Sequence, residues 1–334
     1  MLKVALFTLG GTIASTNTST GAGVAPQLTG ADLVASVPGL DRVGVTTEVH
    51  DFRQVPSSSL TVDDVLDLVR AIRAEVTAGA DGVVVSQGTD TIEETAFLAD
   101  LLYAGQVPVV FTGAMRNPTL DGPDGPANLR AAVTVAASPQ ARGLGCLVVL
   151  GDEIHAARFV RKAHTTSVTA FVSPLTGPLG LVAEGHAIVL TRPARWAPRP
   201  DPRPGAPVRT GLITVVLGDD GTLLDAAAGR FDGLVVAGFG GGHVPGPMAA
   251  ALGDAAQRIP VVLASRTGAG IVLADTYAYP GSEVDLRGRG LIGAGFLDPL
   301  KARLLLHLLL AGGARRDAIA ATFATVAADR PGPA

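Results

Sequence analysis

Short apolar runs of strand length alternate with segments of helical periodicity along the first half of the chain. The apolar runs, rich in valine and leucine, lie at 4–8, 82–86, 108–112 and 146–150. Between them, apolar residues recur with a period near 3.6 in 61–76 and 94–105, which predicts amphipathic helices. Continuous apolar strands separated by such helices indicate parallel pairing with both faces of the sheet covered. We therefore expect an α/β fold whose larger, N-terminal domain, residues 1–190, is a doubly wound, mostly parallel sheet.

A segment rich in proline and arginine, residues 191–210, interrupts this alternation. Proline removes a backbone donor and fixes φ, so the segment cannot form a regular helix or a central strand, and we interpret it as an interdomain linker. Beyond it, runs such as GLITVVLG and PVVLASR, with the helical pattern DPLKARLLLHLLLAGG, predict a second, smaller α/β domain over residues 211–334. A length of 334 residues also favours two domains over one.

Composition narrows the classes of function. The net charge of −4 gives no electrostatic footprint for nucleic acid, so no nucleic-acid partner is expected. No apolar stretch approaches the ~18 residues that a membrane-spanning helix needs, and the opening MLKVALFTLGG lacks the apolar core of a secretory signal. The single cysteine, Cys146, excludes an internal disulfide and lies in an apolar run, as expected of a buried thiol. A cytoplasmic protein without a membrane partner is the simplest expectation, with a processed mature form as the alternative.

Several of the expected strand ends are polar and rich in glycine. They read TLGGTIAS, SQGTDT, FTGAMRNP and GFGGGHVP. Ligands of open α/β sheets bind outside the carboxyl ends of the strands, so chemistry is expected in these segments. TLGGTIAS is neither a GxxxxGK[ST] phosphate loop nor a GxGxxG fingerprint, and Thr12 within it suits helix capping as well as a reactive role. The six histidines show no HExxH pattern and no cysteine partners, so we expect no metal site.

The strand end SQGTDT has two interpretations. Asp90 and Glu93 have the spacing of a helix capping box, and so do Thr91 and Glu94. Capping does not account for Thr89, which neither pair requires. A threonine hydroxyl is a weak nucleophile until a base accepts its proton, so Thr89 indicates nucleophilic chemistry if a base lies nearby.

Lysine is rare in this chain, which makes its positions informative. Only Lys3, Lys162 and Lys301 occur among 26 basic residues, so arginine normally supplies a plain positive charge. A desolvated lysine amine can lose its proton, which arginine does not. Lys162 lies in the polar stretch RFVRKAHTTSVTAF and is either a surface lysine or part of a relay. In that relay Lys162 accepts the Thr89 proton, and Asp90 orients the amine.

Five motifs occur in an order and spacing that resemble one known family. They are TLGGTIAS, SQGTDTIEETAFLADLL, FTGAMRNP with the following DGPDGPANL, RKAHTT, and YPGSEVDLRGRGLIGAGFLDPLKARLLL. Together, over residues 3–315, they resemble the bacterial-type L-asparaginases of the asparaginase/glutaminase family. The resemblance implies two α/β domains and a homodimer or homotetramer with active sites between neighbouring subunits. It also implies hydrolysis of L-asparagine to L-aspartate and ammonia without a cofactor.

The resemblance assigns roles to the matched threonines. Thr12 corresponds to the family's primary nucleophile, which forms an acyl-enzyme intermediate. The residues that correspond to the second triad, which helps to activate water or the nucleophile, are Thr89, Asp90 and Lys162. Backbone N–H groups of Gly11 and Gly88 are expected to hold the substrate carboxylate and the oxyanion, where removing one donor costs on the order of 10²–10³ in rate.

Substrate contacts follow from the same resemblance. Ser57 and Ser58 fall where the family binds the α-carboxylate and α-amino groups, and Ala114 falls where a backbone carbonyl faces the side-chain amide. Glu283 matches an acidic residue that reaches the substrate amine across the dimer interface. Asp90 and Glu283 would together form the anionic pocket for that amine.

Three features depart from the family pattern. The segment 15–30 corresponds to a mobile lid but lacks the tyrosine that many members use on the first nucleophile. We expect another group, or Tyr277 or Tyr279 of a neighbouring subunit, to take that role. Gln87 stands where several members carry histidine, and His243 stands where others carry asparagine, so His243 either lines the site or is structural. These departures bear on substrate preference more than on reaction type.

The leading hypothesis is therefore an L-asparagine amidohydrolase. The alternatives among enzymes are a dual asparaginase/glutaminase that also accepts L-glutamine, and an amidase for a related amide. An inactive amino-acid-binding module belongs to another class, and the presence of every matched nucleophile and relay residue counts against it. A nucleotide-binding Rossmann enzyme is weaker still, because the glycine fingerprint is missing.

Overall fold

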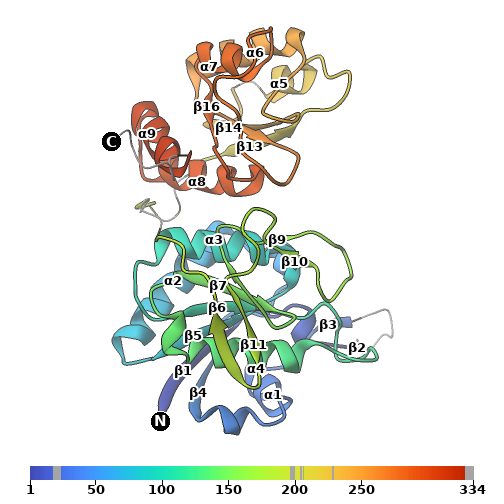
Figure 1. Ribbon diagram of the computed structural model, residues 1–334, viewed down its shortest axis with the longest axis vertical. Helices are drawn as coiled ribbons and strands as arrows, with labels where there is room; N and C mark the ends of the chain where they lie inside the picture. The colour runs from blue at the N-terminus through green and yellow to red at the C-terminus, as the bar shows by residue number, and fades with distance from the viewer. Residues whose placement is uncertain (18–23, 196–199, 204, 206, 228, 328–334) are drawn as a thin grey trace. The chain divides into compact units, whose positions relative to one another are not determined.

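The chain forms two compact units. A computed structural model describes residues 1–17, 24–195, 200–203, 205, 207–227 and 229–327 (Figure 1). The contacts within it divide the chain into an N-terminal unit, Met1–Arg195, and a C-terminal unit, Trp196–Ala334. Parts of the expected linker and lid lie outside the described residues, namely 196–199, 204, 206 and 18–23. The described residues between 190 and 209 form no helix or strand.

Among the described residues, an eight-stranded sheet forms the centre of the N-terminal unit. Its order is β12-β11-β8-β7-β6-β5-β1-β4, and the strands from β7 to β4 pair in parallel. The remaining strands pair antiparallel at one edge. The bounds are β1 (Leu2–Thr8), β4 (Val45–Asp51), β5 (Gly82–Ser86), β6 (Val109–Thr112), β7 (Cys146–Leu150), β8 (Glu153–Ala156), β11 (Gly180–Ala183) and β12 (His186–Val189). The expected mostly parallel sheet is confirmed, with an antiparallel edge in addition.

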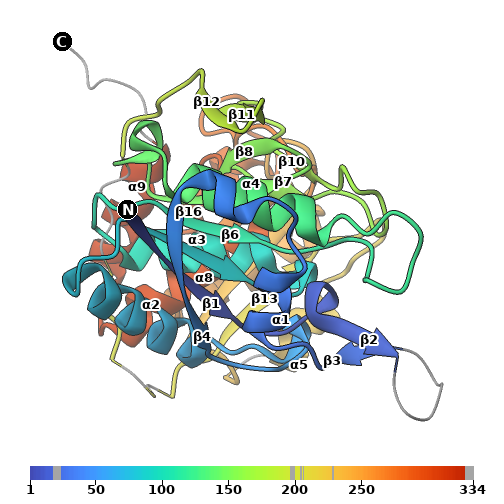
Figure 2. The same ribbon diagram turned by 90° about the horizontal axis from the view of Figure 1, so that it is seen from below.

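Helices cover both faces of this sheet, α2 and α3 on one and α1 and α4 on the other (Figures 1 and 2). Their bounds are α1 (Gly30–Ala35), α2 (Val62–Thr77), α3 (Ile92–Leu102) and α4 (Gly125–Ala136), with 3₁₀ turns η2 (Leu40–Val43) and η5 (Pro139–Ala141). The start of α2 is a capping box in which Thr61 and Asp64 each accept from the other's backbone N–H. Such a cap contributes about 1 kcal/mol. The buried face of α2, which includes Leu68 and Ile72, then packs against the rest of the unit.

Residues of the central strands alternate between the two covered faces. Leu6 and Val84 belong to a core cluster with Leu129 of α4. Phe7 and Val85, the next residues along, point to the other face and are also buried. Because both faces are covered, Val4–Phe7 of β1 and Val83–Val85 of β5 are apolar and buried on both sides, which explains the continuous apolar runs in the sequence.

The carboxyl ends of β1 and β5 meet where the strand order reverses. From β1 the chain crosses to β4 on one side, and from β5 it crosses to β6 on the other. Thr8 is in register with Ser86, so the segments that follow the two strands start side by side. A 3₁₀ turn follows each strand, η1 (Thr12–Ala14) after β1 and η4 (Thr89–Thr91) after β5. Open α/β sheets bind ligands at such a switch point.

The helix capping expected of Asp90 and Thr91 is wrong. Thr91 is the N-cap residue of α3, but its side chain makes no capping hydrogen bond. Its Oγ1 donates instead to the backbone oxygen of Ser57 at 3.1 Å. The Asp90 carboxylate accepts from Lys162 at 2.6 Å. At both residues, hydrogen bonds to distant segments of the chain have replaced local capping.

The C-terminal unit is a smaller α/β layer structure. Its parallel sheet has the order β13-β14-β15-β16. The bounds are β13 (Thr210–Thr214), β14 (Gly233–Gly238), β15 (Val261–Ser265), β16 (Ile292–Gly293), α5 (Thr222–Ala227), α6 (Gly246–Arg258), α7 (Glu283–Gly288), α8 (Pro299–Ala311) and α9 (Arg316–Ala327). One core cluster joins Val236 and Leu263 of the sheet to Leu252 of α6 and Leu286 of α7. Within the described part of the chain, no helix is both long and apolar enough to cross a bilayer.

Candidate active site

Three loops of the N-terminal unit meet around two glycines. Gly11 has a φ of +86°, and a Cβ at this position would overlap the backbone nitrogen of Gly88. A Cβ on Gly88 would in turn lie 2.6 Å from Oγ of Ser57. Glycine is required at both positions because the space is filled by neighbouring atoms. The turn before η1, the turn before η4 and the 3₁₀ turn η3 (Ser57–Ser59) are therefore in direct contact.

Thr12 is half-buried and begins η1 directly after this contact. The turn is held by Oγ of Ser15, which donates to the backbone oxygen of Gly11 at 2.9 Å. The backbone N–H of Ala14 donates to the same oxygen at 3.0 Å. The paired strands β2 (Ser15–Asn17) and β3 (Val24–Pro26) follow and project from the rim of the unit (Figure 2). Thr12 thus lies on a fixed turn at the base of the segment expected to be a lid.

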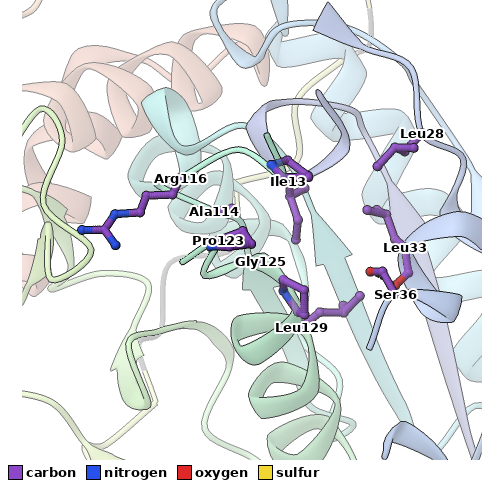
Figure 3. Close-up of a pocket in the computed structure, with 11 residues that line it drawn as sticks. Ile13, Leu28, Leu33, Ser36, Ala114, Arg116, Pro123, Gly125 and Leu129 are labelled. Carbon is purple, nitrogen blue, oxygen red and sulfur yellow. Dashed lines mark hydrogen bonds between the residues drawn. The ribbon is translucent and has the colours of Figure 1, made fainter. Parts of the chain in front are cut away.

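An apolar cavity of about 80 Å³ lies behind η1 (Figure 3). Its lining includes Ile13 of η1, Leu33 of α1 and Leu129 of α4. Arg116 extends away from the other lining residues (Figure 3). A Cβ on Gly125 would lie 2.9 Å from Cγ1 of Ile13, so this glycine makes room for the isoleucine. The cavity offers few polar partners, which makes it unsuited to a zwitterion and assigns it to the packing of the Thr12 turn.

Lys162, Thr89 and Asp90 form one hydrogen-bonded group. Nζ of Lys162 donates to Oγ1 of Thr89 at 3.0 Å and to Oδ1 of Asp90 at 2.6 Å. Thr89 is 5% exposed and the Lys162 side chain 14%, whereas the Asp90 side chain is 70% exposed. The partially buried lysine therefore faces a buried hydroxyl on one side and a solvated carboxylate on the other. The sequence-based relay is brought together from positions 72 and 73 residues apart.

A short β-pair carries Lys162 to this position. β9 (Arg161–Lys162) pairs antiparallel with β10 (Phe171–Val172), which sets Lys162 opposite Phe171. The N–H of Ala163 continues the pairing with a hydrogen bond to Ala170 at 2.7 Å. β9 also lies against α3, the helix that follows Thr89 and Asp90. The backbone on both sides of Lys162 is thus fixed.

The turn that carries Ala114 is held by two residues from the start of α4. Asn128 donates from Nδ2 to the backbone oxygen of Gly113 at 3.0 Å, and its Oδ1 accepts from the N–H of Gly151 at 3.0 Å. The carboxylate of Asp124 accepts from the N–H groups of Met115 and Arg116 at 3.1 and 2.8 Å. Both residues lie in the DGPDGPANL motif, whose sequence alone indicates no such role for Asp124 or Asn128.

Gln87 is fully buried and does not point at open space. Its Nε2 donates to Oγ1 of Thr91 at 3.3 Å, and its Oε1 accepts from Oγ1 of Thr95 at 2.9 Å. Thr91 in turn donates a hydrogen bond to the backbone oxygen of Ser57. Ser57 is 4% exposed, whereas the neighbouring Ser58 is exposed. Gln87 therefore fixes the position of the Ser57 loop through Thr91.

Glu283 starts α7 in the C-terminal unit and is completely buried. Its Oε1 accepts from the backbone N–H groups of Thr276 and Tyr277 at 2.8 and 2.7 Å. Burial opposes ionisation of this carboxyl, but the hydrogen bonds from Tyr277, Thr276 and His243 outweigh it, so the pKa of Glu283 lies below its usual value. Glu283 is therefore a carboxylate at neutral pH.

His243 connects Glu283 to Tyr279, which lies only four residues before Glu283 in the sequence. Nε2 of His243 lies 3.0 Å from Oε2 of Glu283, and Nδ1 lies 3.0 Å from the hydroxyl of Tyr279. The ring of Tyr277 packs edge-on against the imidazole, with centroids 5.1 Å apart. The expected site residues thus fall into two groups, Gly11, Thr12, Ser57, Ser58, Gly88, Thr89, Asp90, Ala114 and Lys162 in the N-terminal unit, and His243 and Glu283 in the C-terminal unit.

One cluster of the described residues has atoms spaced as metal ligands. Oxygens of Glu48 and Glu75 and a ring nitrogen of His50 lie within 4.8 Å of one another. The ammonium of Lys3 is 2.6 Å from Glu48 and 3.6 Å from Glu75. The carboxylates hold the pKa of Lys3 above its ordinary value, mainly through the hydrogen bond to Glu48. A protein cation therefore already pairs with both carboxylates of this cluster, which lies on β4 and α2, and offsets one of their two charges.

Comparison with known proteins identifies the family. Models described as "Asparaginase, N-terminal" and "Glutaminase/Asparaginase C-terminal domain" match residues 3–195 and 209–323. The chain belongs to the asparaginase family. Within this family it is 40% identical to a probable L-asparaginase of Deinococcus radiodurans, over 96% of this chain and 97% of the relative. An L-asparaginase of Bacillus licheniformis is 36% identical, over 92% and 95%.

A solved structure supports the same assignment. The crystal structure of a probable cytoplasmic L-asparaginase from Campylobacter jejuni matches this asparaginase-family chain with a TM-score of 0.85 and 28% identity. The match covers 97% of this chain and 99% of that chain. The expected family and the expected two-domain α/β fold are therefore confirmed.

Proposed function

We propose that this asparaginase-family chain hydrolyses L-asparagine to L-aspartate and ammonia. The observation that carries the proposal is the meeting of the Thr12 turn with the Thr89 turn, where Lys162 donates to the Thr89 hydroxyl. Two threonines and a partially buried lysine at a switch point suit nucleophilic acyl transfer. Family membership and the L-asparaginases among the relatives support the same reaction.

Thr12 is the proposed nucleophile. Its Oγ attacks the side-chain amide carbon, the C=O π electrons move to oxygen, and the Thr12 proton passes to a base. On collapse of the tetrahedral intermediate, the base returns that proton to the amide nitrogen, which leaves as ammonia, while the carbonyl re-forms as an aspartyl ester on Thr12. Backbone N–H groups of Gly11 and Gly88 are the candidate oxyanion donors, and each such donor is worth on the order of 10²–10³ in rate.

Thr89, Lys162 and Asp90 are proposed to act on water. A neutral Lys162 amine accepts the Thr89 proton, and Oγ1 of Thr89 accepts a proton from the water that attacks the aspartyl ester. The Asp90 carboxylate, 2.6 Å from Nζ, stabilises the ammonium that forms. The proton then leaves with the Thr12 oxygen, which regenerates the free hydroxyl.

Substrate recognition follows from the charges of an amino acid. Ser57 and Ser58 are proposed to bind the α-groups, and the Ala114 carbonyl to face the side-chain amide. Asp90 and Glu283 balance the α-ammonium. L-Glutamine is the second candidate substrate, because the C-terminal family model covers glutaminases as well. None of the proposed steps uses a metal or another cofactor.

We propose that Glu283 acts in the site of a neighbouring copy of the chain, in a homodimer or homotetramer. The test uses two inactive variants, Thr12→Ala and Glu283→Ala, carrying different tags and produced together. Each mixed pair then contains one site with both residues intact, so doubly tagged oligomers should recover activity that neither variant shows alone. Doubly tagged oligomers that stay inactive would contradict the proposal.

A cytoplasmic location is proposed as well. The structural relative is described as a probable cytoplasmic enzyme. Fractionation of the source cells, with an antibody against the chain, should find it with cytoplasmic markers, and recovery in a periplasmic or membrane fraction would contradict this.

Ammonia release from L-asparagine and L-glutamine, measured side by side, tests the proposed reaction. We expect release from L-asparagine by the wild-type chain and none above background from Thr12→Ala. Release from both substrates at similar kcat/KM would identify a dual asparaginase/glutaminase. Binding of L-asparagine without ammonia release would identify an inactive amino-acid-binding module. Full release by Thr12→Ala would remove Thr12 from the mechanism.

A further inference from the structure

A line of hydrogen bonds in the C-terminal unit runs from an exposed hydroxyl to a buried carboxylate. The Tyr279 hydroxyl lies 3.0 Å from Nδ1 of His243, and Nε2 of His243 lies 3.0 Å from Oε2 of Glu283. Tyr279 is 47% exposed, the His243 side chain 19% and Glu283 0%. The line is therefore closed at the carboxylate and most accessible at the tyrosine end.

The carboxylate fixes the direction of the protons along this line. Glu283 is ionised and can only accept hydrogen bonds, so Nε2 of His243 carries the hydrogen that faces it. In the tautomer with a hydrogen on Nε2 alone, Nδ1 is an acceptor, and Tyr279 donates its hydroxyl proton to it. The hydroxyl oxygen of Tyr279 keeps a lone pair for a second, external donor.

We propose that Tyr279 is the proton acceptor for the Thr12 hydroxyl, with His243 and Glu283 acting through it as positioning residues. This inference rests on the proposed function, in which Glu283 acts in the site of a neighbouring copy. Tyr279 accompanies Glu283 to that site because one imidazole bridges the two side chains.

The proton movements balance. As Oγ of Thr12 bonds to the amide carbon, its proton moves to the Tyr279 oxygen, and the Tyr279 proton moves to Nδ1 of His243. The imidazolium so formed keeps its Nε2 hydrogen bond to Glu283, which stabilises the positive charge. When the tetrahedral intermediate collapses, the protons return along the same line, and the amide nitrogen receives one as it leaves as ammonia.

The other tyrosines of the chain do not suit this role. The sequence contains three in all, and none lies in the segment 15–30 that follows Thr12. Tyr103 is 2% exposed, and burial raises its pKa to about 12. Tyr277 is 45% exposed, but it contributes its ring to His243 and its backbone N–H to Glu283. Tyr277 therefore belongs to the group that holds Glu283 and His243, and Tyr103 is the tyrosine outside it.

Single replacements separate the Tyr279 hydroxyl from its ring. Tyr279→Phe should lower kcat for L-asparagine by about 10²-fold or more, the usual effect of losing a general base, with KM changed only slightly. His243→Gln retains an N–H for Glu283 but cannot take up a proton, so kcat should fall by a similar factor. Tyr103→Phe, which deletes a buried tyrosine hydroxyl of the N-terminal unit outside this line, should keep kcat near the wild-type value.

Fluorotyrosines at position 279 provide a readout that a purely structural tyrosine would not move. Fluorination changes the acidity of the hydroxyl and leaves the ring almost the same size, so kcat/KM should vary regularly with that acidity. Unchanged turnover in Tyr279→Phe would overturn the inference, while wild-type release and its loss in Thr12→Ala would leave the proposed function intact. If Tyr279→Phe does not fold, the fluorotyrosine series decides, and no dependence on acidity overturns the inference.

Discussion

Gly11 and Gly88 lie backbone against backbone, so that a Cβ on Gly11 would occupy the space of the Gly88 nitrogen. The contact joins the segment that leaves β1 to the segment that leaves β5. Thr12 and Thr89 each follow one of these glycines directly. The two threonines that the proposed mechanism uses are therefore brought to one edge of the sheet by a contact that only glycine permits.

Replacement of Gly11 by alanine should destabilise the fold and abolish ammonia release. The new Cβ would meet backbone atoms at a φ of +86°, and strain of this kind with steric overlap should cost more than about 3 kcal/mol. Gly79→Ala is the control, since Gly79 has a φ of +100° and nothing within 4 Å of a Cβ. The free energy of unfolding of Gly79→Ala should fall by only about 1–2 kcal/mol. Equal losses of the free energy of unfolding in urea would contradict the steric account.

Replacement of Lys162 should affect turnover more than folding. Lys162→Met removes the amine, and Lys162→Arg keeps the charge but not the ability to lose a proton, so both should lower kcat by about 10²-fold or more. Lys3→Arg is the matched control, because Lys3 pairs with Glu48 and Glu75 away from the proposed site. Steady-state ammonia release measures all three. An active Lys162→Arg would show that charge alone suffices.

Replacement of Asn128 should loosen the turn that carries Ala114. Asn128→Ala deletes hydrogen bonds to Gly113 and Gly151 at a site that is 3% exposed. The groups left unpaired should lower the free energy of unfolding by about 2–4 kcal/mol. The KM for L-asparagine should also rise, because the Ala114 carbonyl is no longer held. A stable variant with unchanged KM would remove this positioning role.

His155 should make the N-terminal unit less stable in acid. Its ring is fully buried with Nδ1 3.0 Å from Ser173, and burial lowers its pKa to about 4 from 6.5. Glu153, 3.1 Å from Nε2, is half exposed and screened by water, so it offsets only part of this penalty. As pH falls, the unfolded chain protonates His155 at a higher pH than the folded chain does. His155 therefore leaves the free energy of unfolding at its full value above about pH 6.5 and lowers it toward pH 4, by at most about 1.4 kcal/mol per pH unit.

Urea unfolding at several pH values between about 4 and 7.5 measures that slope. His155→Asn keeps a polar partner for Ser173 and has no group that titrates in this range, so its slope should be smaller than that of the wild type. Identical slopes in the two proteins would contradict the assignment of the acid sensitivity to His155.

Continuous apolar runs were sufficient to predict β1, β5, β6 and β7, but not β4, which precedes the Ser57 turn, or β9, which contains Lys162. The segments 82–86 and 146–150 are strands with those bounds, and every residue in them is buried because both faces of the sheet are covered. The rarity of lysine drew attention to Lys162. Its hydrogen bond to Thr89 spans 73 residues of sequence and depends on the order of strands in the sheet, which periodicity does not specify.

The supporting residues were harder to predict. Asp124 precedes a helix and would be assigned to capping, yet its carboxylate accepts from the loop after β6. Thr91 was assigned to capping for the same reason and bonds Ser57 instead. His243 precedes Glu283 by 40 residues, so the imidazole that joins Tyr279 to Glu283 has no local signal in the sequence.

The most direct test of the account asks which threonine carries the acyl group. Lys162→Met retains both Thr12 and Thr89 but should hydrolyse the ester slowly, so that it accumulates. The variant is mixed with L-asparagine, quenched in acid, digested and mapped by mass spectrometry. The account predicts one aspartyl group on the peptide that contains Thr12. An aspartyl group on the Thr89 peptide, or ammonia release in a burst with neither peptide modified, would contradict it.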